Sequence, residues 1–163
     1  MPNSNRYRPN VGATIFNKSG KIWIGERADI INSSEWQMPQ GGIDKNEEPQ
    51  KAVIREIYEE TGIKSIKIIS KIENWIKYNL PTHLAKEKWN GNYIGQKQKW
   101  YLLYFYGSNK EVNLNLHKKP EFKSWKWEQS RNIETQVAGF RRDVYKKVFT
   151  NFIPKINKTI SYL

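Results

Sequence analysis

The sequence contains no cysteine among its 163 residues. Disulfide bonds, zinc–thiolate centres and thiol nucleophiles are therefore excluded. Histidine is also scarce. His83 and His117 are the only two, and each lies in a polar stretch without a second ligand at metal-binding spacing. Neither histidine is assigned a role.

Long hydrophobic runs are absent as well. No segment approaches ~18 consecutive apolar residues, and the opening MPNSNRYRPN lacks the apolar run of a signal peptide. We therefore expect a soluble, cytoplasmic protein without a membrane partner. No internal repeat, low-complexity tract or long linker divides the chain, so we expect a single domain over residues 1–163 with its core at about 7–152.

Acidic residues are few, 16 against 28 basic residues, and the net charge is +12. Such an excess suits a polyanionic substrate. However, 21 of the 28 basic residues are lysine in a chain rich in Asn and Ile, a composition that an AT-biased genome also produces. The few acids are concentrated: residues 41–63 hold six acids and three bases, a net charge of −3, which leaves +15 for the remainder.

Three of these acids, Glu56, Glu59 and Glu60, fall on one turn of a helix that we expect at about residues 49–61. At about 100° per residue, Glu59 and Glu60 lie about 60° and 40° to either side of Glu56. Like charges repel, and the carboxyl end of the helix, which Gly62 is expected to terminate, disfavours negative charge. A cation among the carboxylates would explain the arrangement, and all-oxygen ligands favour Mg²⁺ or Mn²⁺. The alternative for an isolated Glu run is a solvated helix face.

The residues before the helix complete a longer pattern. From Gly41 the sequence reads GGIDKNEEPQKAVIREIYEETGI, which matches every defined position of the Nudix box. The chain therefore resembles the Nudix hydrolases, which argues strongly against a merely solvated helix face. The resemblance implies an ion pair between Arg55 and Glu47 that pins the loop. Gly41 and Gly62 have structural positions in the motif, and glycine at position 41 permits a close approach of the backbone to a ligand.

The order of expected strands and helices along the rest of the chain predicts an α/β (α+β) fold. The resemblance implies the Nudix fold, a mixed β-sheet sandwiched between helices. Val144, Val148 and Phe149 form the inward face of a second expected helix, at residues 143–152. Residues 153–163 receive no assignment. Strands are expected at residues 11–16, 21–26, 66–70, 73–78 and 99–106 and around Trp125 and Trp127, with a short extended piece at 36–39.

Several segments outside the box narrow the resemblance: YRPNVG at 7–12, WQMPQGG at 36–42, IGQKQKW at 94–100, PEF at 120–122 and FRRDVY at 140–145. Together they resemble the bacterial RNA 5′-pyrophosphohydrolases, a branch shared with dinucleoside polyphosphate hydrolases. The implied substrate is the single-stranded 5′ end of triphosphorylated RNA.

This branch implies roles for residues outside the helix. Glu121 is a candidate metal ligand or general base, or else an exposed loop glutamate. The Gln40 carbonyl is a candidate metal ligand. Val137 and Phe140 match positions that grip a terminal base, and the alternative for both is a core contact at a helix edge. Lys97 and Lys99 lie on the opposite side of an extended strand from Gln96 and Gln98, so all four cannot face one site. The candidate phosphate contacts are Arg8, Arg27, Lys97 and Arg141.

These residues predict metal-assisted hydrolysis of a phosphoanhydride, with a glutamate that accepts the proton of the attacking water. The sequence does not decide which glutamate does so, nor how many metal ions take part. The first hypothesis is removal of pyrophosphate from triphosphorylated RNA, which promotes mRNA decay. The second is hydrolysis of diadenosine tetra- or pentaphosphate with release of ATP. A third, a non-catalytic RNA-binding protein on a decayed Nudix scaffold, predicts a missing box acid, and none is missing.

Overall fold

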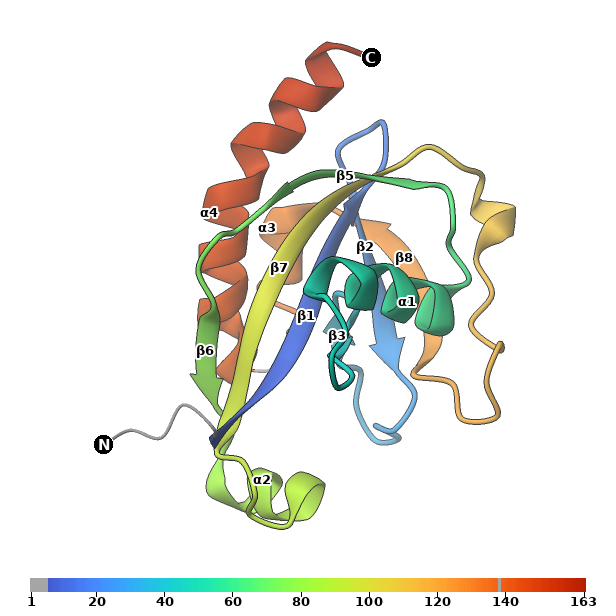
Figure 1. Ribbon diagram of the computed structural model, residues 1–163. Coiled ribbons are helices and arrows are strands. Elements are labelled where there is room, and N and C mark those ends of the chain that lie inside the picture. Colours follow the sequence, from blue (N-terminus) through green and yellow to red (C-terminus); the bar gives the residue numbers. More distant parts are fainter. Residues whose placement is uncertain (1–5, 138) are drawn as a thin grey trace.

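A mixed eight-stranded sheet with helices on both faces forms the body of the molecule (Figure 1). The computed structural model describes residues 6–137 and 139–163. The strands are β1 (Tyr7–Phe16), β2 (Ile22–Arg27), β3 (Trp36–Gln37), β4 (Gln40–Gly42), β5 (Ile66–Lys71), β6 (Ile76–Asn79), β7 (Gly95–Phe105) and β8 (Phe122–Glu128). The helices are α1 (Pro49–Thr61), α2 (Thr82–Trp89), α3 (Ser130–Ile133), α4 (Gly139–Ser161) and the 3-10 turn η2 (Asn109–Glu111).

Strands β1 and β7 form the centre of the sheet. They pair in parallel from Tyr7↔Gly95 to Phe16↔Tyr104. The antiparallel strand β4 pairs with β1 on its other side, and β5 and β6 pair antiparallel with β7. Parallel and antiparallel neighbours in one sheet confirm the expected mixed sheet. The pairing also brings β4, directly before α1, next to the middle of the sheet.

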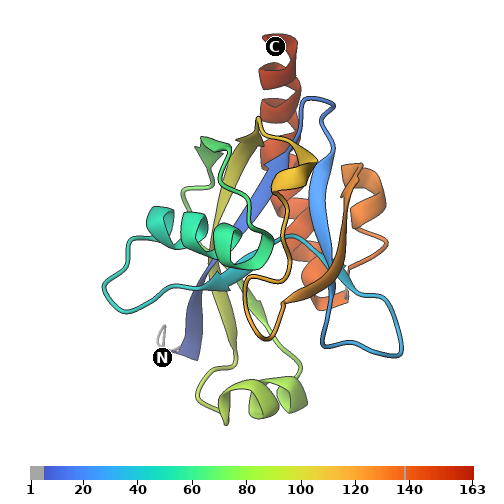
Figure 2. The same ribbon diagram turned by 90° about the vertical axis from the view of Figure 1, so that its right-hand side faces the viewer.

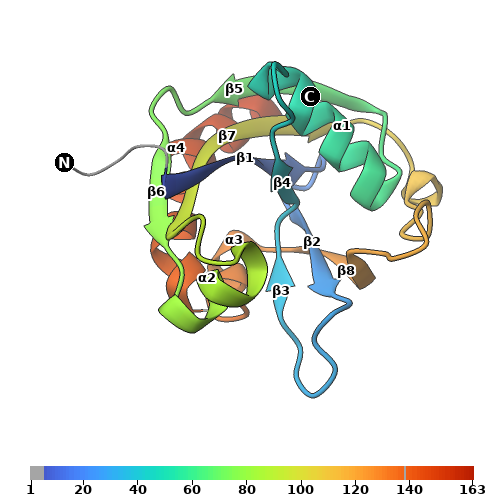
Figure 3. The ribbon, with the colours of Figure 1, turned by 60° about the horizontal axis from the view of Figure 1, so that its bottom comes forward.

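Hydrophobic cores cover both faces of this sheet, because alternate side chains of a strand point to opposite sides. On β7, Tyr101 and Leu103 pack toward α1, whereas Trp100 and Leu102 pack toward α4. Figures 2 and 3 show the two helices separated by the strands. The sheet is therefore the middle layer of a sandwich, as the sequence predicted.

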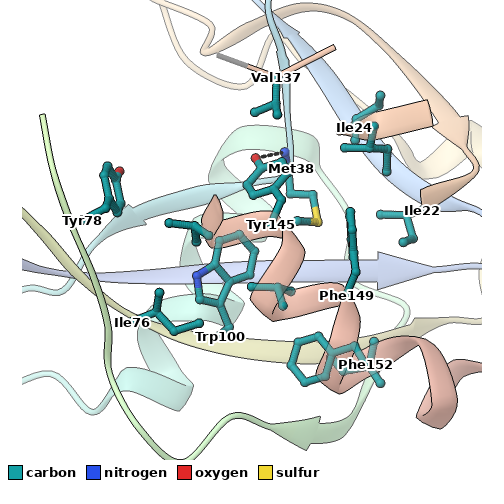
Figure 4. Close-up of a cluster of buried hydrophobic side chains, with 14 of the residues drawn as sticks. Ile22, Ile24, Met38, Ile76, Tyr78, Trp100, Val137, Tyr145, Phe149 and Phe152 are labelled. Carbon is teal, nitrogen blue, oxygen red and sulfur yellow. Dashed lines mark hydrogen bonds between the residues drawn. The ribbon is translucent and has the colours of Figure 1, made fainter. Parts of the chain in front are cut away.

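The core on the α4 side also fixes the segment that leads into α1. Met38 is fully buried, and its backbone N–H donates a hydrogen bond of 2.8 Å to the hydroxyl of Tyr145 on α4 (Figure 4). The Met38 sulfur accepts a hydrogen bond from the Thr14 hydroxyl of β1 at 3.3 Å. These contacts fix Met38 between β1 and α4, two residues before β4 begins.

Several element boundaries differ from the predicted ones. Strand β7 begins at Gly95 instead of residue 99, because Gln96 and Gln98 are buried in a hydrogen-bonded cluster and extend the strand although they are polar. Strand β6 occupies Ile76–Asn79 instead of 73–78. Helix α4 continues to Ser161 through Pro154, since Ile156 still packs into the core. Helix α2 was not predicted from the sequence.

No helix within residues 6–137 or 139–163 is both long and apolar enough to cross a membrane.

Candidate functional site

Helix α1 presents its acidic residues from a fixed position. Pro49 occupies the first turn, where its missing N–H leaves no hydrogen bond unmade. Gly62 ends the helix with φ 77°, a left-handed conformation that favours glycine, and its N–H donates to the Tyr58 carbonyl at 2.8 Å. Ala52 and Ile57 are buried against the sheet. The helix therefore cannot shift without disturbing the core.

Arg55 holds the loop and two of the glutamates together. Its Nε and Nη2 donate to the two carboxylate oxygens of Glu47, each at 2.9 Å, which is the ion pair expected from the sequence. Nη2 also donates to the Gly42 carbonyl at 2.9 Å, and Nη1 donates to Glu56 at 2.9 Å and Glu59 at 3.1 Å. The Arg55 guanidinium lowers the pKa of Glu47 to about 2, so Glu47 stays ionised.

Replacing Arg55 by lysine is expected to loosen this loop, because an ammonium group cannot reproduce the planar, bidentate contact with Glu47. We expect the free energy of unfolding of Arg55→Lys to fall by about 1–3 kcal/mol, the range for hydrogen bonds to charged groups. Urea denaturation measures the change. Arg131→Lys, at an exposed position on α3, is the matched control and should stay within about 0.5 kcal/mol of wild type. Equal stability of both variants would refute the role of Arg55.

Gly41 makes room for the Glu56 carboxylate. A Cβ atom at position 41 would lie only 2.1 Å from Cδ of Glu56, so the carboxylate packs directly on the β4 backbone. Burial raises the pKa of Glu56, and the Arg55 charge offsets part of that effect. A side chain at position 41 would therefore displace the Glu56 carboxylate from the β4 backbone.

Glu60 is the most deeply placed of the three glutamates. Its Oε2 atom is buried without a hydrogen-bond partner. Burial raises the pKa of Glu60 well above its usual value, and the neighbouring charges of Glu121 and Glu56 raise it further. A buried, unpaired carboxylate oxygen beside further carboxylates is a position that a cation would satisfy.

The carboxylates fit a hard divalent cation in chemistry, and those of Glu56 and Glu60 are direct neighbours. No three Asp, Glu or His side chains within the described residues form a ready group of ligands. Glu56 and Glu59 point to the Arg55 guanidinium instead. The fit therefore rests on the all-oxygen donor set and on the unpaired oxygen of Glu60. Glu56 and Glu59 each give one carboxylate oxygen to Arg55, which leaves the second oxygen of each for a metal.

A cleft of about 360 Å³ lies between α2, α4 and the β2–β3 segment. Its lining holds three cations and three carboxylates: Arg27, Lys88 and Arg141, and Asp29, Glu35 and Glu87. Arg27, Phe140 and Arg141 line it, so three predicted substrate contacts meet there. The Arg141 guanidinium lies 4.5 Å from the Phe140 ring centroid, and its Nε is buried without a partner. Arg27 is paired with Asp29, with 3.0 Å between Nε and Oδ1. A buried guanidinium with an unsatisfied donor is suited to a phosphate.

The other predicted contacts lie elsewhere. Val137 is buried in the hydrophobic core on the α4 side and does not line the cleft. Of the two roles considered for Val137, contact with a terminal base or a core contact, the structure shows the core contact. The Lys97 ammonium lies 4.9 Å from the ring centroid of Trp75, away from the cleft. Arg8 reaches the end of β4, where a Cβ on Gly42 would be 2.4 Å from its Nη2. Of these three, only Arg8 is next to the glycines of the acidic cluster.

Two residues of this region were not singled out by the sequence analysis. Tyr78 stacks on Phe140, with ring centroids 6.2 Å apart, and its hydroxyl donates to Gln96 at 2.9 Å. Lys88 of α2 lines the cleft, and burial together with the charges of Arg27 and Arg141 lowers its pKa. The strand alternation around Tyr78 was a usable signal, whereas nothing in the sequence distinguished Lys88 from other lysines.

Polar residues and Glu121 connect the cleft with the acidic cluster. The Gln98 amide donates to Asn10 at 2.8 Å and to the Gln40 side chain at 3.0 Å, so the chain of amides reaches β4. The backbone carbonyl of Glu121 accepts from Ala28, directly after Arg27, at 3.0 Å. The Glu121 charge raises the pKa of both Glu60 and Lys88, so it links the cluster and the cleft electrostatically.

Comparison with known proteins identifies the family. A model of the NUDIX domain matches residues 6–148 of the 163-residue chain. The chain belongs to the NUDIX family. The expected Nudix fold and the hydrolase class are thereby confirmed, and Nudix hydrolases generally require a divalent metal ion.

Similar NUDIX sequences carry one name. The chain is 46% identical over 155 residues to the RNA pyrophosphohydrolase of Wolbachia sp. subsp. Brugia malayi, covering 95% of each chain. It is 42% identical over 155 residues to the RNA pyrophosphohydrolase of Azorhizobium caulinodans, covering 90% of this chain and 92% of the relative. The predicted resemblance to the RNA pyrophosphohydrolase branch is confirmed at the level of sequence.

Solved NUDIX structures share the fold at low identity. The E. coli dihydroneopterin triphosphate pyrophosphohydrolase superposes with a TM-score of 0.67 at 16% identity, covering 89% of this chain and 98% of that one. A C. elegans Ap4A hydrolase binary complex superposes with a TM-score of 0.62 at 20% identity, covering 90% and 98%. These structures support the architecture alone.

Proposed function

We propose that the protein removes pyrophosphate from the 5′ end of triphosphorylated, single-stranded RNA. The observation that carries this proposal is an acidic cluster (Glu56, Glu59, Glu60) together with a cleft in which the Nε of Arg141 is buried without a partner. A reacting phosphoanhydride needs the acidic cluster to hold a metal ion. The phosphates and the base next to the reacting bond need the cleft for binding. The name shared by the similar sequences points to the same reaction.

The reaction adds water across one anhydride bond. The products are RNA with a 5′-monophosphate end and free pyrophosphate. We assign metal ligation to the box glutamates with Glu121 and the Gln40 carbonyl, and Mg²⁺ or Mn²⁺ is the ion to be tested. When bound, the ion supplies neutralisation of phosphate charge and a lower pKa for a coordinated water. The catalytic set is Glu56, Glu59, Glu60 and Glu121.

The chain's own residues orient the substrate. Arg141 presents a guanidinium group with an unpaired Nε in the cleft, which suits a phosphate positioned for in-line attack. Arg27 can bind a phosphate by exchanging its contact with Asp29. Phe140, stacked on Tyr78, offers an aromatic face to a base near the 5′ end. Arg8 lies where the cluster meets β4 and suits the outer phosphates. An RNA substrate implies that the enzyme acts in the cytoplasm, where exposure of a 5′-monophosphate promotes mRNA decay.

A second candidate function is hydrolysis of diadenosine tetra- or pentaphosphate with release of ATP. The aromatic pair of Phe140 and Tyr78 favours it, because a stacked base in the cleft is equally suited to adenosine. The two candidates share the acidic cluster and differ in what lies beyond the phosphates.

The deciding experiment compares both substrates. We would incubate the protein and a Glu59→Gln control with Mg²⁺, or Mn²⁺ in parallel, and either single-stranded RNA with a labelled 5′-triphosphate or diadenosine tetraphosphate. Faster release of pyrophosphate from RNA, absent in the control, supports the proposal. Release of ATP with the RNA untouched establishes the second candidate. If neither substrate is hydrolysed with either ion, both assignments are wrong.

A further inference from the structure

A basic surface lies on the sheet face opposite the Phe140 cleft. Along β6 the side chains alternate: Ile76 and Tyr78 are buried, whereas Lys77 is exposed. On β7, Gln96 and Gln98 face the cleft side, and Lys97 and Lys99 face the other way. We call this surface the β6–β7 shelf and define it by Tyr7, Trp75, Lys77, Lys97 and Lys99.

Cations lie over aromatic rings throughout the shelf. The ammonium groups of Lys97 and Lys99 are 4.9 and 5.1 Å from the ring centroid of Trp75. The Lys77 ammonium is 5.4 Å from the ring centroid of Tyr7. Among the described residues, none of these three lysines forms an ion pair with a carboxylate. The Lys99 ammonium instead donates to the backbone carbonyl of Glu73. The positive charge of the shelf is therefore left for an external anion.

Sheet register connects the shelf to the acidic cluster. Gly41 pairs with Val11, and Val11 pairs with Lys99, so the three residues form one row across β4, β1 and β7. Residues in one row point to the same face, and neighbouring strands are about 4.8 Å apart. Lys99 thus lies about 10 Å from Gly41 between Cα atoms, on the face where the Glu56 carboxylate packs on Gly41. The shelf therefore lies on the same face of the sheet as the acidic cluster, with the buried Val11 between Gly41 and Lys99.

We propose that the β6–β7 shelf binds the single-stranded RNA segment that follows the reacting 5′ end. The inference rests on the proposed function, since only an RNA substrate extends beyond its phosphates as a polyanion. A base that stacks on Trp75 or Tyr7 displaces the ammonium groups from the ring, and these then meet the adjoining phosphates. Lysines interleaved with aromatic side chains bind single strands in this way, without readout of sequence.

The test measures how kcat/KM depends on RNA length. Two triphosphorylated substrates are compared, a dinucleotide and an unstructured RNA of about twelve nucleotides, for wild type, Trp75→Ala and Lys77→Glu. We expect wild type to prefer the longer RNA about tenfold, mainly through KM. Each shelf variant should reduce this ratio about fivefold or more, in line with one stacked base or one phosphate contact. Lys146→Glu, the same charge change on the exposed side of α4, should keep the wild-type ratio.

Binding gives a second readout that needs no turnover. Fluorescence anisotropy with a labelled 5′-hydroxyl RNA of about twelve nucleotides should show weaker binding for Trp75→Ala and Lys77→Glu. For Lys77→Glu, the slope of log K against log salt should fall by about one. Trp75→Phe keeps an aromatic face and should restore most of the affinity. Thermal melts check that each variant is folded, and Lys77 is exposed enough to leave folding intact.

Three outcomes would overturn the shelf. The first is hydrolysis of both RNAs by wild type with the same kcat/KM. This result would refute RNA binding by the shelf and would be compatible with the proposed function. The second is binding of the 5′-hydroxyl RNA by the variants as tightly as by wild type. This result would also refute RNA binding by the shelf. The third is a loss of diadenosine tetraphosphate hydrolysis as large as that of the long RNA, which would make the shelf a nucleoside subsite. Absence of hydrolysis of any triphosphorylated RNA refutes the proposed function itself.

Discussion

Glu60→Gln is expected to lower kcat on triphosphorylated RNA at least about 100-fold, the scale of a lost catalytic carboxylate, while it stabilises the metal-free protein. The wild-type side chain is buried, its Oε2 has no hydrogen-bond partner, and the charges of Glu121 and Glu56 lie nearby. Glutamine has the same shape without the charge. The substitution therefore removes an unfavourable buried charge together with the group that we assign to metal ligation.

The pH dependence of this stabilisation has a definite sign. The pKa of Glu60 is raised in the folded protein, so the folded state binds its proton more tightly than the unfolded state does. Below the unfolded pKa of about 4.3, Glu60 is protonated in both states and carries no penalty. The penalty develops as the pH rises from there toward the folded pKa. The advantage of Glu60→Gln is therefore expected at neutral pH and should disappear on acidification to about pH 4.

Urea denaturation in EDTA at both pH values measures the difference, and initial rates with Mg²⁺ give kcat. Glu48→Gln is the matched control, because it is an exposed acid at the start of the same helix without a side-chain capping bond. It should change neither stability nor rate by much. A Glu60→Gln protein that is less stable than wild type at neutral pH would show that the carboxylate is satisfied in the metal-free fold.

The sequence was most informative where local rules and the motif agreed. The spacing of Glu56, Glu59 and Glu60 with Gly62 predicted the helix and its acidic face, and the structure has α1 at Pro49–Thr61. The Arg55–Glu47 ion pair was predicted from the family resemblance, and two hydrogen bonds form it in the structure. Three further hydrogen bonds from Arg55, to Glu56, Glu59 and the Gly42 carbonyl, hold its guanidinium in place. In this region each residue contacts neighbours that are close in sequence or lie on one strand, so a local pattern was enough to predict the contacts.

The sequence was less informative where burial depends on partners far along the chain. Gln96 and Gln98 are polar residues typical of a surface, yet Tyr78, Asn10 and Gln40 satisfy their amides in the interior. Lys97 belongs to a family-like segment, but the strand pleat turns it away from the cleft to Trp75. Contacts of this kind arise from strand register, which alternation within one segment does not specify.

Because of the strand register, the two faces of the sheet carry different groups of side chains. Alternate residues of β6 and β7 pack toward α4 on one side and form the shelf on the other. Strand β1 connects β7 with β4. A substrate held at β4 is therefore within reach of cations on both faces. Gly41 lies between the acidic cluster and the shelf, because it adjoins Glu56 and lies in the row of Lys99.

Gly41→Ala is expected to lower kcat/KM on triphosphorylated RNA about 100-fold, because an ångström of misplacement at a reacting centre has effects of that size. The added Cβ would lie 2.1 Å from Cδ of Glu56. Helix α1 cannot retreat, since Ala52 and Ile57 anchor it in the core. The Glu56 carboxylate must move instead, and the crowding should lower the free energy of unfolding by about 1–3 kcal/mol.

Steady-state kinetics and thermal melts test this steric explanation against a matched glycine. Gly139→Ala adds a methyl group where no atom lies within 4 Å, so it should leave the melting temperature and kcat/KM near wild type. Glu56→Asp withdraws the carboxylate by one methylene, which makes room for the alanine. The loss caused by Gly41→Ala should therefore be smaller in the Glu56→Asp background than in wild type, a coupling that independent sites do not show. Additive losses would mean that Gly41 acts through the backbone of β4 rather than through the space it leaves for Glu56.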